Sequence, residues 1–232
     1  MVPRLVSVAM VLPFTEEERR GVYRAIYERR DVRAQFLPRP VPDEVLERVL
    51  DAAHHAPSVG FMQPWDFLVI RDRATRQAVN QNFECARRSA VAIYQGEQRE
   101  LYESLTLAGI LDAPVNVCVT CTNQRSRGSG LGRQTDPAVA LYSTVCAVQN
   151  FWLAARAESL GVGWVSIFDF EQLRSTLGIP PAATIVAYLC VGYVSGFRPQ
   201  PELEEKGWES RGTLERVTHF ERWGLQGKGS PK

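Results

Sequence analysis

The sequence lacks the features that mark several large classes of protein. No apolar run approaches the ~18 residues that a membrane-spanning helix needs. The net charge of +1 gives no general attraction to nucleic acid or to an anionic membrane surface. Only three histidines are present, His54, His55 and His219, which is too few for a histidine metal site. We therefore predict no membrane, no nucleic acid and no bound metal.

Cysteine usage limits the chemistry further. Five cysteines, an odd number, lie in apolar stretches, which is typical of a reducing compartment and predicts a cytoplasmic protein. Cys118 and Cys121 form a C-x-x-C motif, but the alternation of VNVCVTC predicts a strand, in which residues i and i+3 face opposite sides. No second cysteine or histidine pair stands at zinc spacing. We expect these residues to be core cysteines.

A dinucleotide-binding fingerprint is missing as well. The glycine-dense stretch GSGLG at 128–132 follows a polar loop and does not lie in a strand-to-helix turn. We interpret the polar, glycine-containing stretch 123–135 as a mobile loop or lid.

What the sequence has is an alternation of helical and strand patterns without internal repeats. The apolar fraction of 45% is enough for a sizeable core. A capping box of Thr15 and Glu18 opens the first helix, and Val22 and Ile26 lie on its inner face. The patterns predict helices at 16–28, 43–56, 73–95, 97–111 and 137–160, a short helix before the last strand, and strands at 65–70, 115–121, 164–168 and 184–192.

The helix at 137–160 is apolar nearly all round, and such a helix has to be covered on every side. We expect a second subunit to provide this cover, and Gly161-Val162-Gly163 to end the helix. The chain after 196 is polar with isolated aromatic residues and cannot bury a core of its own. The predicted organisation is a leader or arm at 1–13, distinct from a signal peptide, a domain at 14–195, and an extension at 196–232 that wraps the partner of a homodimer.

The segment Arg29-Arg30-Asp31-Val32-Arg33 crowds three guanidiniums around one carboxylate. If the helix continued through it, spacings of three and four residues would aim two or three arginines the same way. A converging cluster of this kind suits a phosphorylated ligand, because the guanidinium fork matches a phosphate. The alternative is a helix C-terminus whose cations offset the dipole, with Asp31 as a counter-ion. These five residues alone favour the alternative.

Four stretches change this balance: RRDVRAQFLP, HHAPSVGFMQPW, YSTVCAVQN and GVGWVSIF. They resemble the nitroreductase-type flavoproteins and, within them, the 5,6-dimethylbenzimidazole synthase family, the flavin destructases of cobalamin biosynthesis. The resemblance covers about residues 14 to 225. Asp31 inside the arginine cluster, combined with Ser166, is its most specific part. It implies an α+β fold with a mainly antiparallel sheet flanked by helices, a long central helix, and a C-terminal arm exchanged in a dimer.

The resemblance also implies a reaction. The family takes reduced FMN as a substrate, with molecular oxygen, and fragments it to 5,6-dimethylbenzimidazole and erythrose 4-phosphate. The ribityl C1′ carbon becomes C2 of the product, and a separate flavin reductase supplies the reduced FMN. The ring chemistry belongs to the flavin, while the protein supplies placement, proton transfer and shelter from water.

The arginines would hold the phosphate and ribityl end of FMN, and the backbone at the Pro57-Ser58 loop would meet the isoalloxazine edge. Thr106 and Ala108 stand where the family pattern has charged residues, and Ala140 stands where it has Asp, so Ser104 and Leu105 are weaker contacts. The implied FMN-binding residues are Arg29, Arg30, Asp31, Val32, Arg33, Pro57, Ser58, Ser104, Leu105, Ser166 and Arg211.

The resemblance assigns catalysis to Asp31 and Ser166. Asp31 would stand near the ribityl chain, where carbon–carbon cleavage needs protons removed and returned. A carboxylate held by arginines stays ionised and suits a base better than an acid. Its alternative role is to orient the arginines. The Ser166 hydroxyl would donate to the ring nitrogen N5 or steer oxygen, and its alternative role is to satisfy a carbonyl at a strand end.

Two other functions on the same fold remain open. An NAD(P)H-dependent nitroreductase or flavin reductase would keep FMN as a cofactor, would need an open face over the flavin, and has no evident use for Asp31. A flavin-binding protein without catalysis has no use for a proton-transfer group. Because the stretch 123–135 and the aromatic residues Phe61, Trp65 and Trp164 suit a closed pocket, we expect the oxygen-dependent synthase.

Overall fold

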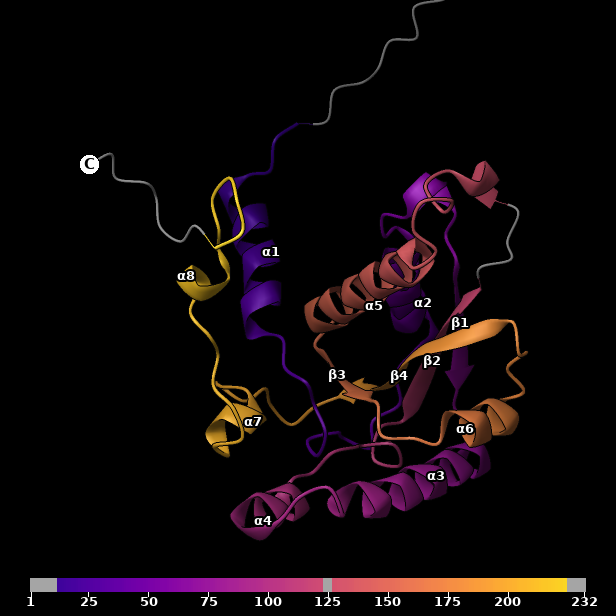
Figure 1. Cartoon of the computed structure of the whole chain (residues 1–232), viewed down its shortest axis with the longest axis vertical. Coiled ribbons are helices and arrows are strands. Elements are labelled where there is room, and N and C mark those ends of the chain that lie inside the picture. Colours follow the sequence, from indigo (N-terminus) through magenta and orange to yellow (C-terminus); the bar gives the residue numbers. More distant parts are fainter. Residues whose placement is uncertain (1–11, 123–126, 225–232) are drawn as a thin grey trace, which may run out of the picture.

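A single antiparallel sheet organises the chain (Figure 1). The computed structural model describes residues 12–122 and 127–224. The strands are β1 (Trp65–Ile70), β2 (Val115–Thr122), β3 (Leu160–Val165) and β4 (Ala183–Tyr193), and they lie in the order β1-β2-β4-β3. Each neighbouring pair is antiparallel. The predicted α+β class with a mainly antiparallel sheet is confirmed.

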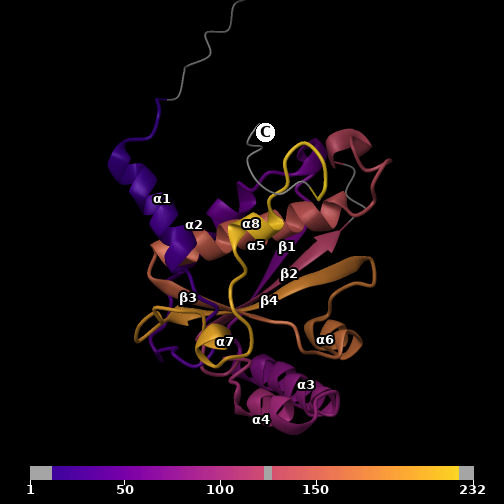
Figure 2. The same cartoon turned by 60° about the vertical axis from the view of Figure 1, so that its left-hand side comes forward.

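Helices cover both faces of this sheet (Figure 2). On one face lie α2 (Asp43–His54) and α5 (Val139–Ala157), and on the other lie α3 (Arg73–Val91), α4 (Gly96–Ser104) and α6 (Phe170–Leu177). The remaining helical elements are α1 (Glu16–Glu28), the short α7 (Glu202–Glu205) and α8 (Leu214–Val217), and the 3₁₀ turns η1 (Val59–Phe61) and η2 (Arg127–Gly130). Residues 123–126 of the predicted loop, 1–11 of the predicted leader and 225–232 of the predicted extension lie outside the described residues.

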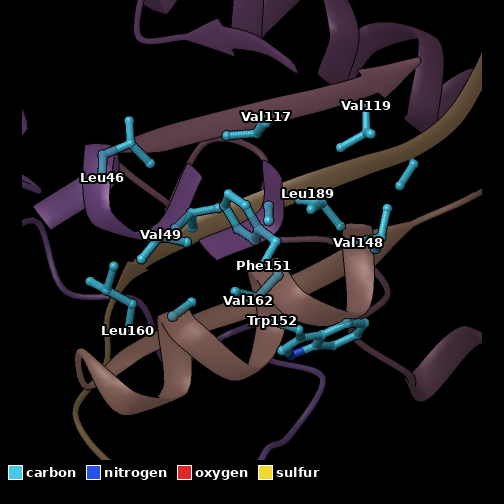
Figure 3. Close-up of a cluster of buried hydrophobic side chains, with 14 of the residues drawn as sticks. Leu46, Val49, Val117, Val119, Val148, Phe151, Trp152, Leu160, Val162 and Leu189 are labelled. Atoms are coloured by element: carbon cyan, nitrogen blue, oxygen red, sulfur yellow. The ribbon is translucent and has the colours of Figure 1, made fainter. Parts of the chain in front are cut away.

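The core between α5, α2 and the sheet is apolar and closely packed (Figure 3). Phe151 of α5 lies among Val49 of α2, Val117 of β2 and Leu189 of β4, and all four are fully buried. A second cluster fills the opposite face of the sheet around Phe83, Leu173 and Tyr188. The sheet is therefore buried on both faces, which explains the near-continuous apolar runs of its central strands.

The two cysteines of the C-x-x-C motif lie apart in this packing. Cys118 belongs to the cluster under α3, while Cys121 packs with Met62 and Ala140. Both are buried thiols outside any disulfide, and burial raises the pKa of the Cys118 thiol to about 12. Cys118 thus remains a protonated core residue, as the strand pattern predicted.

Several element boundaries differ from the predictions, among them the end of α3, at Val91 rather than 95, and the limits of β3, Leu160–Val165 rather than 164–168. Two of the differences have a structural cause. The helix expected at 97–111 ends at Ser104, and the chain then runs irregularly to Pro114. Arg76 stabilises this irregular course, because its guanidinium donates to the carbonyls of Leu111 (3.3 Å) and Ala113 (2.6 Å). A buried backbone carbonyl needs such a partner when no helix supplies one.

The second difference concerns the glycines that were expected to end the long helix. The helix α5 ends at Ala157, and Gly161 and Gly163 lie inside β3. A Cβ at Gly163 would overlap the carbonyl oxygen of Val32, and one at Gly161 would crowd Val32 and Val194. These glycines are therefore required for the close approach of residue 32 to the strand, which local sequence patterns do not reveal.

The first helix has less cover than the pattern predicted. The capping box is present, with the Glu18 N–H donating to Oγ1 of Thr15 and the Thr15 N–H donating to the Glu18 carboxylate. Val22 and Ile26, expected on an inner face, are 47% and 38% exposed, and α1 has no buried residue. The helix α1 stands away from the sheet (Figure 2). The rest of the described chain does not cover its apolar side.

The long helix α5 shows the same imbalance. Its side toward the sheet is buried through Ala147, Val148 and Phe151, while Tyr142 and Val145 on the other side are 59% and 44% exposed. The predicted all-round apolar helix is confirmed, and one chain covers only part of it.

We expect the Gly163→Ala variant to lose about 1–3 kcal/mol of stability, the usual cost of overpacking a filled site. The added methyl group has no room beside the Val32 carbonyl, and backbone cannot move aside as a flexible side chain does. Urea unfolding followed by circular dichroism measures the change. Gly196→Ala is the matched control, since nothing lies within 4 Å of a Cβ there. Equal unfolding midpoints for the two variants would contradict the close approach.

Candidate active site

The arginine segment is not helical, so the prediction that a helical turn aims its arginines the same way is wrong. The helix α1 ends at Glu28, and Arg29 already has extended backbone angles (φ −61°, ψ 146°). Asp31 forms a parallel bridge with Val162 of β3, and the Val32 N–H donates to the Val162 carbonyl (2.9 Å). Val32 itself is buried. The segment is thus a short extended piece laid along β3.

Asp31 is the best-fixed residue of the segment. The backbone N–H of Trp164 donates to its Oδ1 (3.0 Å), and Nη2 of Arg33 donates to its Oδ2 (2.7 Å). The Asp31 side chain remains 32% exposed, while that of Arg33 is only 13% exposed. Each carboxylate oxygen keeps a second lone pair, so Asp31 is held in place and still able to accept a proton.

The three arginines have different partners. Arg29 lies over the Trp152 ring, 5.2 Å from its centroid. The Arg30 guanidinium donates to the carbonyls of Tyr27 and Pro199, and its Nε is buried without a partner. Nε and Nη1 of Arg33 are buried without a partner as well. Unpaired buried donors are costly, so each of these three nitrogens still requires an acceptor, and a bound anion would supply one.

Two other parts of the chain pass close to the arginine segment: the end of β3 before Ser166, and the stretch that follows the predicted contacts Ser104 and Leu105. Ser166 is exposed and follows β3, two residues beyond the Trp164 N–H that binds Asp31. The stretch after Leu105 runs past Arg33, because a Cβ at Gly109 would lie 2.5 Å from the Arg33 carbonyl oxygen. Ser104 is exposed, and its hydroxyl donates to the Leu101 carbonyl (2.7 Å).

Leu105 is buried, and its carbonyl accepts a hydrogen bond from Arg87 (3.0 Å). Arg211 is exposed in the C-terminal extension, where its N–H donates to the Glu204 carboxylate (3.2 Å). A ligand contact of Ser104, Leu105 or Arg211 remains a prediction.

Pro57 and Ser58 lie toward the opposite end of α5. The Val59 N–H donates to Oγ of Ser143, near the start of α5, whereas the Arg30 carbonyl accepts from Nε1 of Trp152. Nine residues separate Ser143 from Trp152, which is about 13 Å along a helix axis. The structure therefore does not bring the Ser58 loop and Asp31 together within one chain.

The Ser58 loop itself is strained. Phe61 and Gln63 have positive φ angles of 52° and 46°, which non-glycine residues rarely adopt. Phe61, expected in a closed pocket, is 72% exposed, so that expectation is wrong for this residue within one chain. The Gln63 N–H donates to Oγ of Ser58 (3.1 Å), and this bond together with Ser143 keeps the loop in its unusual shape.

Sequence reasoning missed two residues that shape this loop. Ser143 lies in the motif YSTVCAVQN and is buried. A hydroxyl side chain in a largely apolar helix was the feature of the sequence that could have pointed to it. His54 accepts a hydrogen bond from the Trp65 indole N–H through Nδ1 (3.1 Å). No spacing rule connects that pair, because the contact depends on how β1 follows α2.

Within residues 12–122 and 127–224, no three His, Cys, Asp or Glu side chains gather as metal ligands would. In that same part of the chain, no helix is both long and apolar enough to cross a membrane.

Known proteins share this architecture and these motifs. A model described as Nitroreductase family matches residues 26–193. The chain belongs to the nitroreductase family. It is 42% identical to the 5,6-dimethylbenzimidazole synthase of Rhodospirillum rubrum over 79% of this chain and 86% of that protein. It is 38% identical to the 5,6-dimethylbenzimidazole synthase of Rhodobacter capsulatus over 84% of this chain and 94% of that protein.

Solved structures agree in fold. A BluB-like flavoprotein from Clostridium difficile 630 matches with a TM-score of 0.65 at 20% identity, covering 87% of this chain and 99% of that one. Iodotyrosine deiodinase bound to FMN and 3-iodo-L-tyrosine matches with a TM-score of 0.68 at 22% identity, covering 86% and 100%. The nitroreductase-like fold and the resemblance to the 5,6-dimethylbenzimidazole synthases, which are enzymes, are both confirmed.

Proposed function

We propose that this enzyme fragments reduced FMN with molecular oxygen to 5,6-dimethylbenzimidazole and erythrose 4-phosphate. The observation that carries the proposal is the Asp31 carboxylate, fixed by the Trp164 N–H and Arg33 and still able to accept a proton. The 42% identity to a synthase supports it. A separate flavin reductase supplies the reduced FMN in this scheme.

The arginine segment binds the anionic end of the substrate. The unpaired buried donors of Arg33 and Arg30 take the phosphate, since guanidinium donors match phosphate oxygens. Arg29 and Arg211 of the extension complete this end, and Val32 contributes by fixing the segment along β3 through its hydrogen bond to Val162. The same donors fit FMN whether it is a substrate or a resident cofactor, so they do not decide between synthase and reductase.

Proton transfer distinguishes the functions. Reduced FMN and oxygen supply the redox chemistry when bound. Asp31 takes the proton that leaves the ribityl chain and returns it, because Arg33 and the Trp164 N–H hold its carboxylate in place and leave it lone pairs that can accept. Ser166, exposed beyond β3, donates its hydroxyl to the flavin ring. Ser104 and Leu105 line the end of the site that holds the flavin ring.

We also propose that the enzyme is a homodimer with parts of each site on both chains. Val145 and Tyr142 of α5 and Val22 of α1 leave apolar surface exposed. A twofold axis across α5 would run the two helices antiparallel. The Pro57-Ser58 end of one chain would then lie beside the Asp31 end of its partner.

The extension completes the proposed dimer. Leu214, Val217 and Trp223 are 73%, 72% and 91% exposed, although all three are large apolar side chains. Three such residues within ten positions form a surface that suits a partner. The first part of the extension stays with its own chain, since Phe197 and Pro199 contact Arg156 and Arg30. We therefore assign the partner contact to the part after residue 212.

The reaction itself is the direct test. Purified protein incubated aerobically with pre-reduced FMN should form dimethylbenzimidazole, detected by chromatography with mass identification. It should form none without oxygen, and it should oxidise NADH or NADPH negligibly when oxidised FMN is present. Rapid NAD(P)H turnover with a nitroaromatic compound and no benzimidazole would assign the chain to the reductases. Flavin binding with neither activity would leave a binding protein.

The role of Asp31 is tested by Asp31→Asn, which keeps the shape and removes the base. We expect benzimidazole formation to fall by roughly 10²–10⁴-fold, the range of general-base catalysis, while reduced FMN still binds and oxidises. Ser166→Ala should give a smaller loss with more uncoupled oxidation. Arg48→Ala, which breaks an exposed pair with Glu158, is the control. Product within a few-fold of wild type in Asp31→Asn would reduce Asp31 to orienting Arg33.

Assembly is tested by light scattering at micromolar concentration. We expect a particle of twice the 26.0 kDa chain mass, because the proposed interface lies in the obligate range above ~2,000 Å². Val145→Asp should weaken the dimer, since it places a charge on the exposed side of α5. Ile93→Asp, at a side chain 77% exposed between α3 and α4, should leave the dimer intact. A stable folded monomer of the natural chain would rule the dimer out.

A further inference from the structure

Trp208 of the extension contacts two stacked tyrosines beside α4. The rings of Tyr94 and Tyr102 stack with centroids 4.7 Å apart and planes at 28°. The Trp208 ring meets Tyr94 edge-on at 5.5 Å and Tyr102 at 6.2 Å. Aromatic pairs at such separations attract one another beyond their buried area. The extension is thereby attached to the α3–α4 pair.

The helix α4 has few other attachments. Tyr102 is its only buried side chain, Leu101 is half-buried, and the other residues of the nine-residue helix are polar or glycine. A helix of this length is not stable in isolation. Arg87 of α3 donates to the carbonyls of Glu103 (3.2 Å) and Leu105 (3.0 Å), which fixes the C-terminal end of α4 only. Among the contacts that hold the rest of the helix, the tyrosine stack and Trp208 are therefore the main ones.

Tyr102 brings a cost that these contacts offset. Its hydroxyl is buried and has no hydrogen-bond partner, and burial raises its pKa. An unsatisfied buried hydroxyl costs about as much as two aromatic contacts contribute. Movement of α4 away from the extension would return this hydroxyl to water. The observed position of α4 against the extension, which we call closed, is therefore favoured by only a small free energy. The contacts of Trp208 contribute part of that free energy.

The same stretch of the extension reaches the arginine segment. The Arg30 guanidinium donates to the Pro199 carbonyl. The backbone N–H of Trp208 donates to the carbonyl of Leu203 in α7 (2.8 Å). Figures 1 and 2 show α7 between α1 and α4. Residues 199–208 therefore connect Arg30 on one side of the site with α4, and so with Ser104 and Leu105, on the other.

We propose that Trp208 is a positioning residue that holds α4 closed, so that the Ser104-Leu105 segment stays over the bound flavin. This inference rests on the proposed function, since it takes Ser104 and Leu105 as ligand contacts. Trp208 touches no reacting atom. It acts by slowing the outward movement of α4, which retains the ligand and keeps water out.

Hydrogen–deuterium exchange of the full-length protein without ligand tests the mechanical part. In Trp208→Ala we expect amides of residues 96–105 to exchange about tenfold faster, the change that about 1.4 kcal/mol produces in an equilibrium constant. The amides of β2 and β4 should be unchanged. Trp208→Phe should restore most of the protection. Ile93→Ala, at the exposed neighbour of Tyr94, is the matched control and should exchange like wild type.

Stopped-flow fluorescence with oxidised FMN tests the consequence for the ligand. We expect FMN to dissociate about tenfold faster from Trp208→Ala and near the natural rate from Trp208→Phe, with association changed little. Wild-type exchange at 96–105 in Trp208→Ala, or equally faster exchange throughout the sheet, would overturn the proposal. Neither measurement requires turnover. A chain that makes no benzimidazole but shows the local changes keeps this role and loses the proposed reaction.

Discussion

The close approach of Asp31 and Val32 to β3 is the constraint on which the rest of the site depends. Gly161 and Gly163 leave room for it, and the Val32–Val162 hydrogen bond fixes it. The approach ends α1 at Glu28, because the chain has to extend in order to lie along a strand. It also puts the Asp31 carboxylate against the Trp164 N–H. A glycine pair thus determines the position of a carboxylate about 130 residues away.

Much of the fold follows from local patterns, because those patterns coincide with burial. The helix α2 and the strand β1 have the predicted limits to within about two residues, and the capping box at Thr15 is present. The patterns fail where contacts distant in sequence decide. The stretch 105–111 looks helical, but it is irregular, and Arg76 donates to the carbonyls of Leu111 and of Ala113 just beyond it. Val22 and Ile26 look internal, but their cover is not in the described chain.

The site was harder to predict from residues alone. The segment 29–33 allowed both a phosphate site and a solvated helix end, and the choice depends on whether the helix continues. That depends on Gly163, which no local rule connects to Asp31. The resemblance to the synthases predicted the residues of the site, but it did not predict how far apart they lie within one chain. The loop of Pro57 and Ser58 lies against α5 at Ser143, and the arginine segment lies against it at Trp152. These two points are about 13 Å apart along the helix axis, a distance that only the folded chain reveals.

The poor cover of α1 sets the order in which the molecule can form during synthesis. This helix leaves the ribosome before the other helices and strands that the structure describes. Its ion pair with another element, between Glu28 and Arg156, cannot form until α5 has been made. Arg29 to Arg33 continue from α1 and need β3, which is made later still. The helix that is made first among the described elements is therefore among the last to be fixed. A nascent chain that has passed Arg33 but is shorter than about 165 residues contains every arginine of the segment and lacks the complete strand β3 along which the segment lies.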